Sequence, residues 1–241
     1  MGDDVAASFA PAEVAPLVCG HRGMPAGAPE NSLPGFALAG SNGASWIEFD
    51  VRPCADQLVV HHDPVTATAR HIATTPRDEL GSDIASLEQV IEAFGPTMGL
   101  DIELKTDDIG IALDEFVDRT LQTLADAAEL VDLSHVLVTS FDQRALSLVR
   151  AGDSGVSTGL IFHKRSMDWA IAAALAEGHS AVVPWYPLVT AAGVERAHSN
   201  DLLVATWTVN TTGQVRSVAA DGVDMIIGDD SALIVRSLAH R

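Results

Sequence analysis

The sequence predicts a single-domain (β/α)₈ TIM barrel, and three observations lead to that prediction. The chain has 241 residues, 47% of them apolar, which suffices for one large core and is close to the usual length of such a barrel. Short apolar segments alternate with helical patterns, as in a parallel sheet with crossover helices. No linker or long charge run divides the chain, so residues 1–241 are interpreted as one domain.

Eight short apolar segments, each followed by a helical pattern, are the expected barrel strands. They lie at residues 16–20, 46–51, 99–105, 135–141, 157–162, 181–186, 202–209 and 224–229. Two of the intervening helices have clear end signals. Ser86 and Gln89 have the spacing of a capping box, and Ser166 and Gly178 bracket a second helix.

A ninth apolar segment, "QLVVHHD" at residues 57–63, does not fit the eightfold count. Only six residues separate Val51 from Leu58. A parallel crossover needs roughly a dozen residues or more, whereas an antiparallel return can use a short turn. The segment is therefore predicted to form a hairpin with the second barrel strand, which returns the histidines at its end to the barrel mouth.

Charge and composition exclude several classes of partner. The formal net charge of -19 argues against nucleic acid as the main partner and against docking on an anionic bilayer. The first sixteen residues are acidic and lack the features of a signal peptide, and no apolar run reaches membrane-spanning length. Cys19 and Cys54 are expected to be reduced structural thiols. These features predict a cytoplasmic protein without stable membrane insertion; the sequence does not set its oligomeric state.

Three acidic side chains at strand ends form a candidate metal site. Glu48 and Asp50 alternate along the second strand and so share one face, and Glu103 lies near the end of the third. The carboxyl ends of barrel strands meet at one mouth, where active sites lie. Three carboxylates there would repel one another unless a cation lay between them. Oxygen ligands alone suit Mg²⁺ or Ca²⁺ rather than zinc.

Histidines and cations occur at the same strand ends. His61 and His62 are neighbours on a strand and point in opposite directions, so at most one of them enters the site. His21 and that one histidine make a plausible acid and base. Arg22 and Lys105 suit an anionic oxygen. Together with a metal, these groups fit phosphoryl transfer better than acyl transfer or redox chemistry.

Other histidines and aromatic residues have weaker signals. Trp46 and Trp169 are expected to pack in the fold. Trp185, Tyr186 and Trp207 end strands and are equally consistent with a pocket wall and with core packing. The histidines expected to be on the surface or structurally satisfied are His71, His135, His163, His179, His198 and His240.

Eight motifs in this order resemble those of the glycerophosphodiester phosphodiesterase family. They extend from near the first residue almost to the last. The motifs are "HRG" (21–23), "PENSLPGF" (29–36), "GASWIEFDV" (43–51), "LVVHHDP" (58–64), "IASLEQVIEAF" (84–94), "LDIELK" (100–105), "ATWTVN" (205–210) and "GVDMIIGD" (222–229).

The resemblance implies a phosphatidylinositol phospholipase C-like barrel that cleaves a glycerol phosphodiester with one divalent cation, Mg²⁺ or Ca²⁺. By motif position, His21 and His62 correspond to the acid–base pair, so the resemblance selects His62 over His61. Glu30 and Asn31 fall in a motif expected to brace a loop. The resemblance assigns the metal ligands to Glu48, Asp50 and Glu103 and the phosphate-contacting cations to Arg22 and Lys105. Trp207, at the end of a strand, is expected to contact the substrate.

One departure from the family and two alternative functions bear on the substrate. The segment from His62 to Ser86 is shorter than the family's usual insertion, which predicts an open mouth. The first alternative function is a lysophospholipase D. It would need an apolar groove for the acyl chain, and Phe162, Trp185 and Trp207 could line such a groove. A non-catalytic barrel that binds a phosphate ligand would not require two histidines. The alcohol headgroup, the choice of metal, and a cyclic-phosphate or direct-water route stay open.

Overall fold

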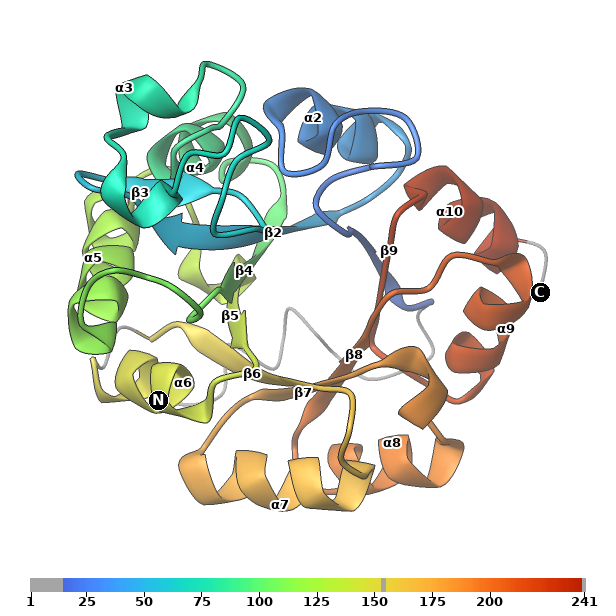
Figure 1. Ribbon diagram of the computed structural model, residues 1–241. Helices are drawn as coiled ribbons and strands as arrows, with labels where there is room; N and C mark the ends of the chain where they lie inside the picture. Colours follow the sequence, from blue (N-terminus) through green and yellow to red (C-terminus); the bar gives the residue numbers. More distant parts are fainter. Residues whose placement is uncertain (1–14, 153–154, 240–241) are drawn as a thin grey trace.

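Eight parallel strands close into a barrel in the computed structural model, which describes residues 15–152 and 155–239 (Figure 1). Pairing of the first strand with the second, with Cys19 opposite Trp46, closes the sheet. The expectations for residues 1–14 and for His240 lie outside the described residues. The barrel strands are β1 (Leu17–Gly20), β2 (Trp46–Pro53), β4 (Gly99–Leu104), β5 (Val136–Ser140), β6 (Ser157–Phe162), β7 (Ala181–Pro184), β8 (Leu203–Thr206) and β9 (Met225–Gly228).

Helices surround this barrel and connect consecutive strands (Figure 1), which confirms the (β/α)₈ prediction. Ser86 and Gln89 form the expected capping box. The Ser166 side chain accepts a hydrogen bond from the Trp169 N–H, and Gly178 ends the same helix with a left-handed φ of 72°. The surrounding helices are α2 (Leu33–Ser41), α4 (Leu87–Phe94), α5 (Leu113–Asp126), α6 (Gln143–Ala151), α7 (Met167–Glu177), α8 (Ala191–His198), α9 (Thr212–Ala220) and α10 (Ser231–Ala239).

The predicted hairpin is also present. Strand β3 (Leu58–Val60) pairs antiparallel with β2, with Val60 opposite Val51. The next backbone N–H, that of His61, donates to the carbonyl of Asp50 at 2.9 Å, so the hairpin ends at the rim that β2 has reached. The short segment that follows contains a 3₁₀ turn (Ile72–Thr74) and helix α3 (Arg77–Leu80). A small separate core lies beneath it, made of Cys54, Val59, Ile72, Leu80 and Ile84.

Strand residues alternate between two packed layers. Side chains such as Phe49 and Ile102 point outward and belong to the main core between strands and helices. The inward-facing side chains fill the barrel itself, so the barrel is a core rather than a pore. This inner cluster consists of Cys19, Trp46, Leu137, Ile161, Ala181, Val183, Ala205, Met225 and Ile227. Toward the carboxyl ends of β2 and β4, polar side chains replace it.

Several smaller expectations can be compared with the structure. Cys19 and Cys54 are buried free thiols. His198 contacts Asp224 at 2.9 Å, whereas His179 is buried beside Thr158 and keeps one ring nitrogen without a partner. His71 and His135 are exposed. In the described part of the chain, no helix has both the length and the apolar character needed to cross a bilayer.

The inner layer generates a prediction about stability. At Gly99 an added methyl group would lie 2.2 Å from the ring of Trp46, which is buried inside the barrel. We expect Gly99→Ala to lower the free energy of unfolding by about 1–3 kcal/mol through overpacking. Denaturant unfolding measures the change. The matched control is Gly213→Ala in α9, where nothing lies within 4 Å of the new methyl group and helix propensity favours alanine by about 1 kcal/mol. Equal effects of the two substitutions would contradict the packing argument.

Candidate active site

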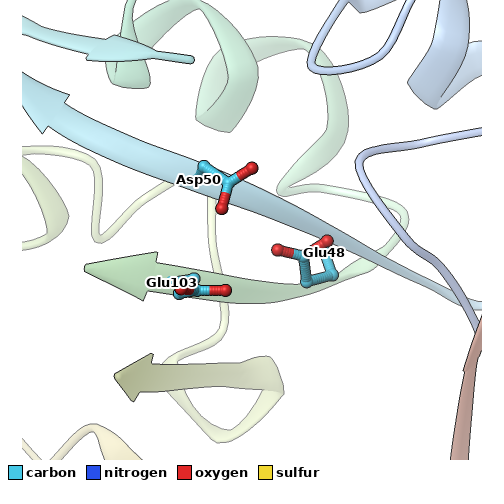
Figure 2. A group of neighbouring side chains, drawn as sticks. All are labelled: Glu48, Asp50 and Glu103. Carbon is cyan, nitrogen blue, oxygen red and sulfur yellow. The ribbon is translucent and has the colours of Figure 1, made fainter. Parts of the chain in front are cut away.

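Three acidic side chains converge from the middle of β2 and the end of β4 (Figure 2). Glu48 and Asp50 project from β2 on the same face, and Glu103 lies opposite Asp50 in the parallel register of β2 with β4. One carboxylate oxygen from each residue lies within 4.8 Å of the others. The structure therefore brings together the three residues that the sequence predicts as metal ligands.

Two of these carboxylates accept a hydrogen bond at one oxygen and none at the other. Oε2 of Glu48 accepts a hydrogen bond from the backbone N–H of Arg22 at 2.7 Å, and Oδ2 of Asp50 accepts one from the Asn31 side chain at 2.8 Å. Oε1 of Glu48 and Oδ1 of Asp50 are buried without a hydrogen bond. Such atoms are costly unless a ligand satisfies them. A hard divalent cation with oxygen ligands fits this donor set.

Burial and mutual repulsion shape the charge state of the three carboxyls. Burial raises the pKa of Glu48 well above its ordinary value, and the charges of Asp50 and Glu103 raise it further. Burial also raises the pKa of Glu103. Burial acts in the same sense on Asp50, but Lys105 and Arg22 outweigh it, and the pKa of Asp50 is lowered. A bound cation would favour the ionised form of all three.

Arg22 and Lys105 pack against these carboxylates. The Nε of Arg22 lies 3.2 Å from Asp50, and its Nη1 lies 3.0 Å from Glu30. The Nζ of Lys105 lies 2.8 Å from Glu103 and 3.5 Å from Asp50. Both cations are therefore fixed at the rim before any anion binds.

The "HRG" turn requires its glycine. Arg22 has a left-handed φ of 50°, and this conformation directs its N–H to Glu48. Gly23 follows with a φ of 84°. A methyl group on Gly23 would lie 2.7 Å from the carbonyl carbon of Gly35, so only glycine permits this close passage of the chain.

Each predicted catalytic histidine is held by a carboxylate through Nδ1. Nδ1 of His21 lies 2.7 Å from Asp229, whose other oxygen accepts a hydrogen bond from Asn210. Nδ1 of His62 lies 2.7 Å from Asp63. Engagement of Nδ1 leaves Nε2 available for proton transfer. Burial alone would raise the pKa of Asp229, but its hydrogen bond to His21 lowers that pKa, so Asp229 stays ionised.

A pocket of about 210 Å³ opens beside these groups. It is lined by His62 and not by His61, which lines a separate cavity on the other side of the hairpin. Asp50, the other predicted metal ligand on β2, is not among the residues that line the pocket. The pocket is lined by His21, Arg22, Glu48, His62, Asp101, Glu103, Lys105, Thr139, Phe141, Ile161, Val183, Trp207 and Ile227.

Trp207 lines the pocket and also packs against the inner cluster, so both roles left open by the sequence apply to it. Its indole N–H donates to the carbonyl of Val183 at 3.0 Å, and Phe141 packs edge-on against its ring at 5.6 Å. Trp185 instead packs on Tyr186, is 41% exposed and does not line this pocket. Trp46 lies in the barrel interior and Trp169 packs against the main core, both as expected.

Comparison with known proteins agrees with this geometry. The model of the glycerophosphoryl diester phosphodiesterase family matches residues 21–233. The chain belongs to this family. It is thus a phosphodiesterase enzyme of this class, as the sequence motifs indicate.

Three relatives illustrate the extent of the similarity. A glycerophosphodiester phosphodiesterase of Caldanaerobacter subterraneus is 26% identical over an alignment of 240 positions, which covers 91% of this chain and 96% of the relative. The structure of an Oleispira antarctica phosphodiesterase in complex with the product sn-glycerol-3-phosphate has a TM-score of 0.83 at 23% identity and covers 97% of this chain and 99% of its own. A Thermotoga maritima glycerophosphodiester phosphodiesterase has a TM-score of 0.78 at 23% identity, with coverage of 93% and 99%.

Sequence reasoning missed several residues of the site. Asp229 is the last residue of the "GVDMIIGD" motif, but nothing in the sequence paired it with His21. Asp101 alternates with Glu103 on β4 and so could have been assigned to the same inward face. Asn31, expected only to brace a loop, binds both the carboxylate and the backbone N–H of Asp50, the latter at 3.1 Å. Thr139 approaches from β5, which carries no motif.

The Asp229 contact leads to a testable expectation. Asp229→Asn should lower kcat on a glycerophosphodiester by about 10–100-fold, because His21 loses the carboxylate that orients its ring and stabilises its protonated form. Steady-state kinetics with glycerophosphocholine measures this. Asp224→Asn is the matched control, since Asp224 contacts His198 in a similar pair at the opposite end of β9. Equal losses in the two variants would show that the effect is on folding rather than on His21.

Proposed function

We propose that this enzyme hydrolyses small glycerophosphodiesters to an alcohol and glycerol phosphate, with one divalent cation and with His21 and His62 as its acid–base pair. One observation supports this above others: three carboxylates, two of them with a buried oxygen that accepts no hydrogen bond, share a barrel mouth with two carboxylate-held histidines. The family match to residues 21–233 supports treating the chain as one catalytic domain. The product complex of the Oleispira relative supports glycerol phosphate as the product.

Charge balance supports a divalent cation at the site. Four inward carboxyl groups lie at or just below the mouth (Glu48, Asp50, Asp101 and Glu103), against the two fixed cations Arg22 and Lys105. If all were ionised, the excess would be two negative charges. Glu48, Asp50 and Glu103 would hold the ion, and their oxygen donors suit Mg²⁺ and Ca²⁺ alike. When bound, it would supply Lewis-acid stabilisation of charge on the phosphoryl oxygens.

The two histidines would divide the proton transfers between them. One removes the proton of the attacking hydroxyl through Nε2, and the other protonates the departing alcohol. Asp229 and Asp63 keep each ring oriented and stabilise its protonated form. The glycerol 2-hydroxyl is our preferred nucleophile, giving a cyclic phosphate that water then opens. A diester without that hydroxyl would react only if water attacks directly.

Arg22 and Lys105 would stabilise charge on the phosphoryl oxygens. Each is already paired with carboxylates, so little side-chain entropy is lost when the phosphate binds. Trp207 would form one side of the substrate site, with its ring fixed by the hydrogen bond to Val183.

Removal of either proposed catalytic histidine should slow hydrolysis. His21→Ala and His62→Ala should each lower kcat by about 10²–10⁴-fold, which is the usual contribution of a general acid or base. His61→Ala is the control, because His61 is adjacent in sequence but lines another cavity. Phosphodiester hydrolysis is measured with Mg²⁺ and with Ca²⁺. If His21→Ala or His62→Ala kept the wild-type kcat, its assignment would be wrong.

Binding of a divalent cation should stabilise the folded protein. Titration of chelator-treated protein with Mg²⁺ or Ca²⁺ should raise the unfolding temperature, with a gain of about 2.7 kcal/mol at a hundredfold excess over Kd. Glu103→Gln should remove most of that gain, because it removes one ligand charge. Glu92→Gln, on the exposed face of α4, is the control. Thermal unfolding reports this independently of activity, and an equal gain in Glu103→Gln would argue against the site.

A further inference from the structure

A fourth carboxyl group lies beside the three proposed metal ligands, because Asp101 lies opposite Glu48 in the parallel register of β2 with β4. Asp101 precedes Glu103 by two residues on β4, so it shares the inward face and lies about 6.6 Å deeper along the strand. Its side chain is 1% exposed, yet it lines the same pocket as His21 and His62. Asp101 is not part of the group whose ligand atoms lie within 4.8 Å of one another.

Asp101 forms a polar pair with Thr139 between the neighbouring carboxylates and the apolar inner cluster. The Thr139 hydroxyl, itself buried on β5, donates to Oδ1 of Asp101 at 2.7 Å. Among the described residues, no lysine or arginine forms an ion pair with Asp101. A carboxylate has about four acceptor positions, and this hydrogen bond uses one of them. A buried carboxyl with unused hydrogen-bonding capacity is costly unless a polar ligand group reaches it.

The pocket around this pair is small and closed below. Its 210 Å³ is less than the roughly 300–1,000 Å³ typical of ligand pockets. Ile161, Val183 and Ile227 belong both to its lining and to the inner cluster that fills the barrel beneath. The phosphate-binding groups lie at the rim, so whatever lies below them must be a short moiety.

We propose that Asp101 hydrogen-bonds the terminal hydroxyl of the substrate's glycerol moiety, with Thr139 as its positioning residue, and that the site therefore selects diesters of free glycerol over lysophospholipids. This inference rests on the proposed function. With the phosphate at the rim and the 2-hydroxyl beside it, the terminal hydroxyl is the group that extends deepest. A hydroxyl both donates and accepts, so recognition does not depend on the protonation state of Asp101.

The selectivity follows from the same contact. In a 1-acyl lysophospholipid an ester replaces the terminal hydroxyl, so it can no longer donate to Asp101, and its acyl chain would enter a pocket with no room below. A site built to hydrogen-bond a hydroxyl rejects analogues without it because its buried polar group is left unpaired. In this binding mode the alcohol on the other side of the phosphate points out of the barrel and does not contact Asp101 or Thr139.

The test combines a substitution of Asp101 with a substrate analogue that lacks the terminal hydroxyl. Wild type and Asp101→Leu are assayed on glycerophosphocholine and on 2-hydroxypropyl phosphocholine, which lacks only the terminal hydroxyl. We expect Asp101→Leu to lower kcat/KM by about 10–100-fold on the first substrate and by less than about 3-fold on the second. Equal losses on both substrates would overturn the proposal.

Further variants separate recognition from other roles. Thr139→Val should show a smaller loss with the same substrate dependence, and Thr139→Ser should restore activity. Ser140→Ala is the matched control, because it removes a neighbouring hydroxyl of β5 that donates to the Leu104 carbonyl. Metal-induced thermal stabilisation should be unchanged in Asp101→Leu; its loss would make Asp101 a metal ligand and would overturn the proposal.

The headgroup and the acyl chain complete the test. The effect of Asp101→Leu should be the same for glycerophosphocholine, glycerophosphoethanolamine and glycerophosphoglycerol; an effect confined to cationic headgroups would show that the headgroup lies in the pocket. Wild type should hydrolyse a short-chain, monomeric lysophosphatidylcholine at least about 10²-fold more slowly than glycerophosphocholine. Comparable rates would overturn the selectivity. Silence of wild type on every diester would instead refute the proposed function itself.

Discussion

Repulsion among buried carboxyl groups from the middle of β2 and the end of β4 is the constraint on which the rest of the site depends. Glu48, Asp50 and Glu103 each lose hydration there, and each raises the cost of ionising its neighbours. The protein offsets this only in part with Arg22 and Lys105. The remaining negative charge and the buried oxygens that accept no hydrogen bond make the site suitable for a cation and, through it, for a phosphate.

The surrounding fold holds these groups in place from several directions. The left-handed turn at Arg22 and Gly23 directs a backbone N–H to Glu48, and Asn31 binds Asp50 twice. The carboxylates that orient the histidines come from the end of β9 and from the segment after β3. Because these segments are far apart in sequence, the site exists only when the barrel is closed by the pairing of β1 with β2.

The apolar filling of the barrel has a second consequence, for substrate size. Ile161, Val183 and Ile227 of this filling also line the pocket, so the pocket has little room toward the barrel interior. In the proposed binding mode, the side chains inside the barrel contact the glycerol moiety, which lies next to the phosphate. If the glycerol moiety occupies this pocket as proposed, the same packing that stabilises the barrel also limits the size of the group that fits there.

The sequence by itself determined the barrel, the hairpin and most of the site, because these depend on local patterns. Strand periodicity placed Glu48 with Asp50 on one face, and the six-residue spacing before Leu58 required an antiparallel return. Only the tertiary structure decided which side chains from distant strands meet. The contacts of Asp229 with His21 and of Thr139 with Asp101 join residues 208 and 38 positions apart. Such pairs have no local signature, since strand order and stagger bring them together only when the sheet closes.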